Sequence, residues 1–133
     1  MIFSVRKTKD GDGLGYLTFD KVDINIGGGF DGSAGGFKAP ITGIYKMTVS
    51  GQFSHFENTL PLYTSIAVVT DKSIGFFISD SNTAENTDGN NVSYTWMMEL
   101  KAGNEVKLFS KRDLYFYNYN FPLTFTGELI HID

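Results

Sequence analysis

The sequence of 133 residues contains no cysteine. This excludes a disulfide framework, a thiol nucleophile and a zinc site built on thiolates. No run approaches the length of about 18 apolar residues that a membrane-spanning helix requires, and no apolar segment near the start has the form of a signal peptide. Basic residues are in the minority, with 11 Lys and Arg against 15 Asp and Glu and a net charge of −4. We therefore expect neither nucleic-acid binding through phosphate neutralisation nor insertion into a membrane.

Helical periodicity is also lacking, because no segment longer than two turns places apolar residues at helical spacing. Apolar and polar residues alternate instead, most clearly over residues 92–100, and turn-forming clusters separate these segments. With 15% aromatic residues and 15 glycines, the chain is typical of a β-sandwich or barrel, and we expect one domain over residues 1–133. Gly127 marks a bulge or the close approach of another segment. The alternation predicts the following inward-facing residues: Val92, Tyr94, Trp96, Met98, Leu100, Val106, Leu108, Leu123, Phe125 and Leu129.

Gly27, Gly29 and Gly32 form the spacing G-x-G-x-x-G, which is typical of dinucleotide-binding loops. That motif works only where a helix begins at the last glycine, so that its N-terminal amides meet the pyrophosphate. Here Pro40 and Gly43 oppose a helix, and no acidic residue follows about 20 positions on to hold a ribose. The sequence therefore argues against nucleotide binding and predicts a strand from residue 45 onward. The inward-facing residues of this strand are Tyr45, Met47 and Val49.

The same part of the chain carries a second pattern, in which aromatic residues are spaced around an asparagine and a G-x-Y follows. Its members are Phe19, Asn25, Phe30, Phe37, Gly43 and Tyr45. In this pattern the chain resembles the globular C1q domain, the head of complement component C1q and its relatives. Three further segments are similar to family motifs and follow in the family's order: IFSV at 2–5, MELKAGNEVKL at 98–108 and TFTGELIHID at 124–133.

This resemblance implies an all-β fold, a ten-stranded jelly-roll sandwich of two antiparallel sheets that is shared with tumour necrosis factor. It also implies a compact homotrimer, which in most relatives is a secreted ligand-binding head without catalytic activity. The glycine-rich segment would then be a loop between two strands, where glycine adopts positive φ without strain. The sequence departs from the family's aromatic pattern at Met47, Val49 and Glu128. The first two are volume-tolerant changes on an inward face, and Glu128 is expected to meet solvent on the face opposite Leu129.

The segment 79–91, SDSNTAENTDGNN, is rich in the hard oxygen ligands that calcium prefers. Asp80 and Asp88 are the first candidates for a calcium site, with Glu85 and Asn90 beside them. Some relatives bind calcium near the apex of the trimer, just before a strand that corresponds to the one beginning at Val92. A solvated hairpin loop that turns at its Asp-Gly pair explains the same residues without a metal. The sequence leaves both interpretations open.

The segment 113–121, DLYFYNYNF, places Tyr115, Tyr117, Tyr119 and Phe121 at alternating positions. Tyrosine and asparagine together form surfaces that bind proteins or stack on sugars, since each ring joins a flat apolar face to a polar group. The same rings also suit the core of the sandwich or a three-fold interface, because large aromatics are seldom exposed in a row. Tyr115, Tyr117 and Tyr119 are therefore candidate ligand-binding residues with a structural alternative.

No catalytic motif surrounds the two histidines, His55 and His131. His131 alternates inward beside Leu129, which predicts a hydrogen-bonded structural side chain rather than a catalytic acid or base. Asn91 begins an Asn-Val-Ser triplet for N-glycosylation, which matters only in a chain that enters a secretory pathway. We expect no enzymatic activity.

The sequence thus predicts a non-catalytic, homotrimeric recognition domain that binds a glycan, an anionic surface or a protein receptor. Three weak sites acting at high effective concentration would supply its affinity. The alternative is a trimerisation scaffold within a larger intracellular or fibre protein, with no small ligand. Recognition implies an extracellular location, and the scaffold alternative includes a cytoplasmic one as the C-terminal domain of a larger protein.

Overall fold

The computed structural model describes most of the chain. The backbone is described for residues 1–7, 15–31, 36–55, 63–70, 73–82, 90–110, 114–116 and 123–133. Side chains are described for residues 1–7, 16–31, 36–51, 68–70, 93–110 and 123–133. These segments are strands, turns and connections without a helix, as the alternation predicts.

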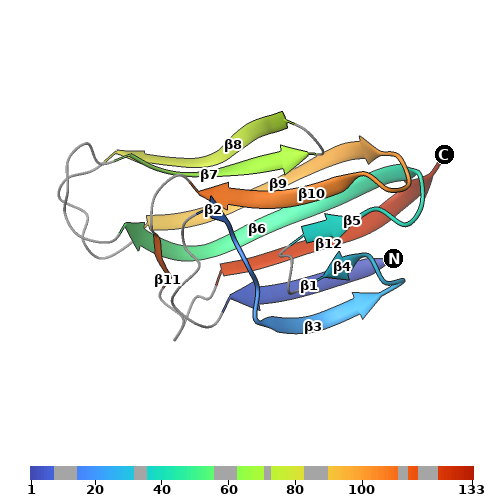
Figure 1. Ribbon diagram of the computed structural model, residues 1–133, viewed down its shortest axis with the longest axis horizontal. Helices are drawn as coiled ribbons and strands as arrows, with labels where there is room; N and C mark the ends of the chain where they lie inside the picture. The colour runs from blue at the N-terminus through green and yellow to red at the C-terminus, as the bar shows by residue number, and fades with distance from the viewer. Residues whose placement is uncertain are drawn as a thin grey trace.

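Two antiparallel sheets, sheet A and sheet B, make up the sandwich (Figure 1). The strands of sheet A are β1 (Ile2–Lys7), β3 (Lys21–Ile26), β6 (Gly43–His55), β9 (Asn90–Leu100), β11 (Leu114–Phe116) and β12 (Leu123–Ile132). Their order is β9–β6–β12–β1–β3, and the short β11 pairs with the last residues of β6. The strands of sheet B are β2 (Gly15–Tyr16), β4 (Phe30–Asp31), β5 (Gly36–Lys38), β7 (Tyr63–Thr70), β8 (Ser73–Asn82) and β10 (Glu105–Ser110). Their order is β4–β5–β10–β7–β8, and β2 pairs with β10.

The expected fold class, a jelly-roll sandwich of two antiparallel sheets, is confirmed. The described chain contains twelve strand segments rather than the ten expected. Two of them, β2 and β4, are only two residues long and each adds two paired positions to a longer neighbour. Alternation needs about four residues before it becomes visible in a sequence, so segments of this length escape it. In sheet A, β12 lies between β6 and β1 and pairs with both.

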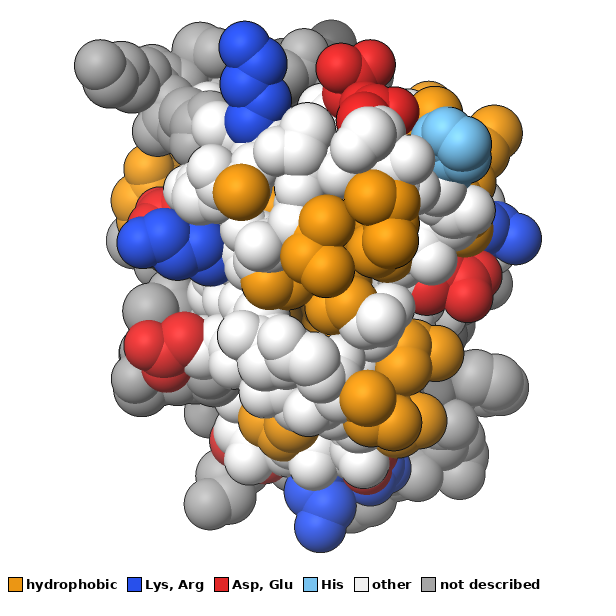
Figure 2. Space-filling model, turned by 90° about the vertical axis from the view of Figure 1, so that its right-hand side faces the viewer, with side chains coloured by type: hydrophobic (Ala, Val, Ile, Leu, Met, Phe, Trp, Pro, Cys, Tyr) orange, Lys and Arg blue, Asp and Glu red, His pale blue; other side chains and the backbone are white. Residues whose placement is uncertain are grey.

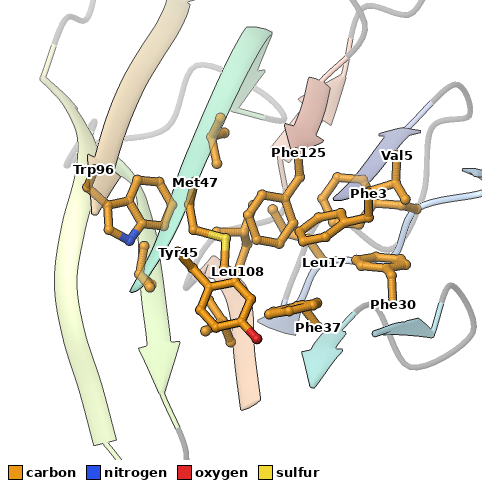
Figure 3. Close-up of a cluster of buried hydrophobic side chains, with 14 of the residues drawn as sticks. Phe3, Val5, Leu17, Phe30, Phe37, Tyr45, Met47, Trp96, Leu108 and Phe125 are labelled. Carbon is orange, nitrogen blue, oxygen red and sulfur yellow. The ribbon is translucent and has the colours of Figure 1, made fainter. Parts of the chain in front are cut away.

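The core lies between the two sheets and is dominated by aromatic rings (Figure 3). Phe3 of β1 stacks on Phe30 and Phe37 at centroid distances of 5.2 and 4.8 Å, and it meets Phe125 of β12 edge-on at 5.1 Å. Ring pairs in these arrangements stabilise a core beyond the area that they bury. Other fully buried side chains come from alternating positions of β6, β10 and β12, as the sequence predicts: Tyr45, Met47, Val49, Val106, Leu108 and Leu123.

The first part of the glycine-rich segment, residues 27–29, forms a turn between β3 and β4, as expected. Gly27 and Gly28 have φ angles of +88° and +67°, a conformation that glycine adopts far more readily than other residues. Asn25 fastens the turn, because its Nδ2 donates to the Phe30 carbonyl oxygen at 3.1 Å and its Oδ1 accepts from the Phe30 N–H at 3.4 Å. Strand β4 follows directly at Phe30. The described part of the segment therefore consists of turns and strands without a helix, whereas a dinucleotide-binding loop leads from a strand into a helix.

Gly127 marks a close approach rather than a bulge. In β12 it lies opposite Phe3 on one side and Met47 on the other. A Cβ at this position would come 2.8 Å from the Met47 Sδ and would overlap the edge of the Phe3 ring. The missing side chain makes room for the Phe3 ring in the centre of the core.

Two expectations about burial are wrong. His131 is exposed rather than inward-facing, and Figure 2 shows a histidine side chain at the surface on the end that carries both termini. A β-bulge between Leu129 and His131 shifts the pairing with β6, so the alternation does not continue past Leu129. Tyr94 is 41% exposed although Trp96 on the same strand is buried. The Tyr94 ring lies on the same face of β9 as Trp96, with the two ring centroids 5.8 Å apart, so its face is as predicted and only its burial is not.

Candidate functional site

The predicted calcium ligands are only partly described. Asp80 lies near the end of β8, where its backbone pairs with Ser65 of β7, and its side chain lies outside the described part of the chain. Asp88 lies outside the described residues altogether. Among the side chains that are described, no three His, Asp or Glu come together as a metal site. Calcium binding at Asp80 and Asp88 therefore stays a prediction.

Tyr117 and Tyr119 lie outside the described residues, and Tyr115 and Asn91 are described by their backbone alone. Tyr115 in β11 pairs with Ser54 near the end of β6, and Asn91 in β9 pairs with Gln52 of the same strand. Figure 1 shows this end of the sandwich on the left, opposite the two termini, together with the end of β8 that carries Asp80. The topology thus gathers three of the predicted residues at one end of the molecule. Their roles in glycosylation, ligand binding and calcium binding stay predictions.

The outward face of sheet A, which is turned away from the core, carries a row of hydroxyl groups. Thr95 of β9, Thr48 of β6, Thr126 of β12 and Ser4 of β1 are in register across four strands. The Oγ1 atoms of Thr48 and Thr95 share a hydrogen bond of 3.1 Å. The row continues on β3 at Ile24, which is 40% exposed.

In the next row on this face, apolar side chains lie on both sides of two charged ones. Met97, Lys46, Glu128, Ile2 and Ile26 are in register from β9 to β3. Met97 and Ile26 are 66% and 64% exposed. Glu128 faces away from the core, as the sequence predicts. This row therefore combines large exposed apolar side chains with one basic and one acidic residue.

A hollow of about 360 Å³ lies between these two rows. Its floor includes Gly127 and Phe3, and its walls come from four strands. The wall residues are Ile2, Ser4, Ile24, Lys46, Thr48, Thr126 and Glu128. The volume lies within the range of about 300–1,000 Å³ that is usual for ligand pockets, and it is equally suited to a protruding side chain of another protein chain.

This surface was not predicted from the sequence. Residues 21–26 alternate, with Val22, Ile24 and Ile26 at every second position, and such a strand is usually half-buried. In the structure all six residues of β3 are exposed. The alternation was a signal for an apolar strand face, but the sequence does not indicate whether that face meets the core or a partner.

An ion pair joins the edge strand β3 to β1. The Arg6 Nε donates to the Asp23 Oδ2 at 2.6 Å, and the Arg6 Nη2 donates to the Asp23 Oδ1 at 2.9 Å. These hydrogen bonds lower the pKa of the Asp23 carboxyl and raise the pKa of the Arg6 guanidinium. Both side chains are about one-third exposed, so solvent screens the interaction. The bidentate geometry orients β3 beside the bulge that separates Ser4 from Val5.

Comparison with known proteins agrees with this architecture. A sequence model of the C1q domain matches residues 2–130. Among solved structures, the globular domain of zebrafish complement 1qA protein is similar with a TM-score of 0.68, over 99% of this chain and 98% of that chain. The two share 16% sequence identity, so this likeness shows the fold alone. No curated protein matches the chain in sequence, and the described part of the chain holds no helix that is long and apolar enough to cross a bilayer.

Proposed function

The chain belongs to the C1q domain family, and on this basis we propose that it is a non-catalytic recognition domain that works as a homotrimer. Members of the family are typically trimeric recognition heads, generally lack enzymatic activity and are typically secreted. The proposed ligand is a glycan, an anionic surface or a protein receptor. The proposed location is extracellular.

The observation that carries the proposed assembly is the exposed apolar surface on the outward face of sheet A. Ile2, Ile24 and Ile26 lie together there on the paired strands β1 and β3 and are at least 38% exposed, and Ile2 and Ile24 line the hollow of about 360 Å³. Figure 2 shows that apolar side chains also gather across the adjoining end of the molecule. Soluble monomers rarely expose large contiguous apolar patches. Two further copies of the chain would cover this surface, and the hollow would accept a side chain of a neighbouring copy.

A trimer also supplies the mechanism of recognition. In the proposed assembly, the same loops of three copies point toward the same side, so that one ligand-bearing surface meets three equivalent sites. Once the first site is occupied, the other two bind at high effective concentration. Single-site affinity can therefore be weak while the assembly remains firmly bound.

Light scattering tests the assembly directly. The wild-type protein is expected to have a mass of three times 14.8 kDa. Ile24→Lys is expected to dissociate this trimer into monomers, because a lysine in the wall of the hollow replaces an apolar contact with a buried charge that has no added partner. The matched control is Ile41→Lys, since Ile41 is 41% exposed and lies in the turn before β6. This variant is expected to remain trimeric.

A wild-type monomer in this experiment would contradict the proposed trimer. A trimeric Ile24→Lys variant beside a monomeric Ile41→Lys variant would place the interface away from sheet A. The recognition half of the proposal is tested on the intact trimer with a glycan array, anionic vesicles and candidate receptor ectodomains. Binding to none of these would favour the scaffold alternative.

Calcium binding at Asp80 and Asp88 is part of the proposal. It is supported by the carboxylates of the segment 79–91 and by the position of Asp80 at the end of the sandwich opposite the termini. Excess chelator is expected to lower the melting temperature, because a ligand that binds only the folded state stabilises it. The variant with both residues changed to asparagine is expected to melt at the same temperature with and without calcium. A wild-type protein indifferent to chelator would contradict the calcium site.

A further inference from the structure

A second hollow lies on the outward face of sheet B, over β4, β5 and β10, and has a volume of about 200 Å³. Its floor is formed by Gly29, Gly36 and Phe37. Four charged residues line its rim: Asp31, Lys38, Glu105 and Lys107. Pockets for drug-sized ligands usually measure about 300–1,000 Å³. The smaller volume of this hollow suits a ligand portion of about one ring.

One glycine keeps the hollow open. Gly36 pairs with Lys107 of β10, and a Cβ at Gly36 would come 2.8 Å from the Lys107 Cε and 3.0 Å from its Cγ. A side chain at this position would fill the floor or displace Lys107 from the rim. A Cβ at Gly29 would instead overlap the Phe37 ring, which is buried in the core. The hollow therefore depends on Gly36 having no side chain.

The rim residue Lys107 is held in place before any ligand arrives. Its stem lies across Gly36, and its Nζ is 4.0 Å from the Glu105 Oε2 and 5.2 Å from the centre of the Tyr16 ring. The Tyr16 ring is itself held edge-on against Phe109 at 5.3 Å, and half of its surface is exposed. Side chains that are already ordered lose less conformational entropy when a ligand binds. This part of the rim is therefore suited to binding.

We propose that this hollow binds one ring of a neutral carbohydrate. The two carboxylates of the rim accept hydrogen bonds and the two ammonium groups donate them, whereas each sugar hydroxyl does both. The two positive and two negative charges cancel, so an anion or a cation gains no net attraction there. A neutral polyhydroxylated ring uses donors and acceptors alike. The exposed Tyr16 ring lies beyond Lys107 as a flat surface for a second sugar residue.

The site rests on the proposed recognition function and deepens it by naming the ligand class. Sheet B turns its outward face away from sheet A, because the two sheets enclose the core between them. A trimer that assembles through sheet A therefore leaves three copies of the hollow exposed. A branched or repeating glycan could then occupy more than one copy at once.

Titration of ¹⁵N-labelled protein with methyl glycosides of neutral hexoses and N-acetylhexosamines tests the proposal by NMR. At least one of these glycosides is expected to give saturable shifts of the backbone amides of Gly29, Gly36, Lys38, Glu105 and Lys107. Inorganic phosphate serves as the anionic counter-probe and is expected to leave these amides unchanged. A panel that moves none of these amides would overturn the proposal, as would phosphate moving them more strongly than any glycoside.

Two lysine variants test whether Lys107 contributes to binding. Lys107→Met is expected to weaken glycoside binding at least about tenfold, the loss that follows from removing a hydrogen bond to a charged group. Lys101→Met is the matched control, because Lys101 is exposed in the turn that follows β9; its binding is expected to stay within about twofold of wild type. Equal binding by both variants would overturn the assignment of Lys107 to the site.

The test of this hollow and the test of the proposed function can fail independently of each other. A trimer that binds glycans while its shifts map to the opposite end of the sandwich would keep the recognition function and overturn this site. A monomer that still binds glycosides at the hollow would support the site and contradict the trimer. Light scattering on the NMR samples distinguishes the two cases.

Discussion

Changing Gly43 to alanine is expected to lower the free energy of unfolding by about 3 kcal/mol, at the upper end of the usual cost of overpacking. Gly43 begins β6 and pairs with Leu100 of β9 on one side and Ile132 of β12 on the other. A Cβ there would overlap the carbonyl oxygen of His131 and come 2.8 Å from the Leu129 Cδ1. Because the nearest atom belongs to the backbone of a paired strand, relief requires the sheet itself to shift. Urea unfolding followed by fluorescence measures the loss.

The control for this prediction is Gly28→Ala. Gly28 has a φ of +67° and nothing within 4 Å of the position that a Cβ would take. Its replacement adds backbone strain of about 1 kcal/mol and no steric overlap. We therefore expect Gly43→Ala to lose clearly more stability than Gly28→Ala. The reverse order would show that the start of β6 can move away from His131 at little cost.

Changing Phe3 to alanine is expected to cost about 3–5 kcal/mol, the range measured for large aromatic deletions in protein cores. Phe3 is fully buried and touches the rings of Phe30, Phe37 and Phe125. Its ring also occupies the space that a side chain at position 127 would take. Both sheets contribute to this cluster, so the cavity would weaken the contact between them. Thermal and urea unfolding of the variant, at the protein concentration used for wild type, measure the effect.

Ile2→Ala provides the comparison for Phe3→Ala. Ile2 is the preceding residue on β1 and points to the outward face of sheet A, where it is 38% exposed. Its truncation is expected to cost about 1 kcal/mol in a dissociated chain, because it removes less buried area than the truncation of the fully buried Phe3. A loss at Ile2 as large as that at Phe3 would contradict the assignment of the two faces of β1.

Much of this architecture follows from local patterns in the sequence. Alternation is enough to place Tyr45, Met47 and Val49 in the core, because the side chains of a strand point to opposite faces in turn. The spacing of Asn25 and Phe30 belongs to the pattern by which the chain resembles the family, and the structure explains it by the two hydrogen bonds that Asn25 makes across the turn. Gly127 was recognisable as an exception among apolar neighbours, since a glycine inside a strand usually signals a close approach.

Other features depend on contacts that no local pattern contains. The bulge after Leu129 exposes His131, and it arises from pairing with a strand more than eighty positions earlier in the chain. All six residues of β3 are exposed because β3 is the edge strand of sheet A, although its residues alternate like those of a half-buried strand. The hollow over Gly29 and Gly36 is likewise assembled from segments far apart in sequence. Tyr117, Tyr119 and Asp88 lie outside the described residues, so their predicted roles rest on the sequence alone.

The position of β12 between β6 and β1 has a consequence for how the chain folds. β12 follows every other strand in the sequence, yet it occupies the middle of sheet A. Until it inserts, sheet A is divided, and both β6 and β1 present unpaired backbone groups along one edge. Open edges of this kind recruit strands from other chains, and pairings between distant segments form slowly. The closing step of folding is therefore also the step that removes the risk of aggregation, and it awaits the synthesis of residues 123–132.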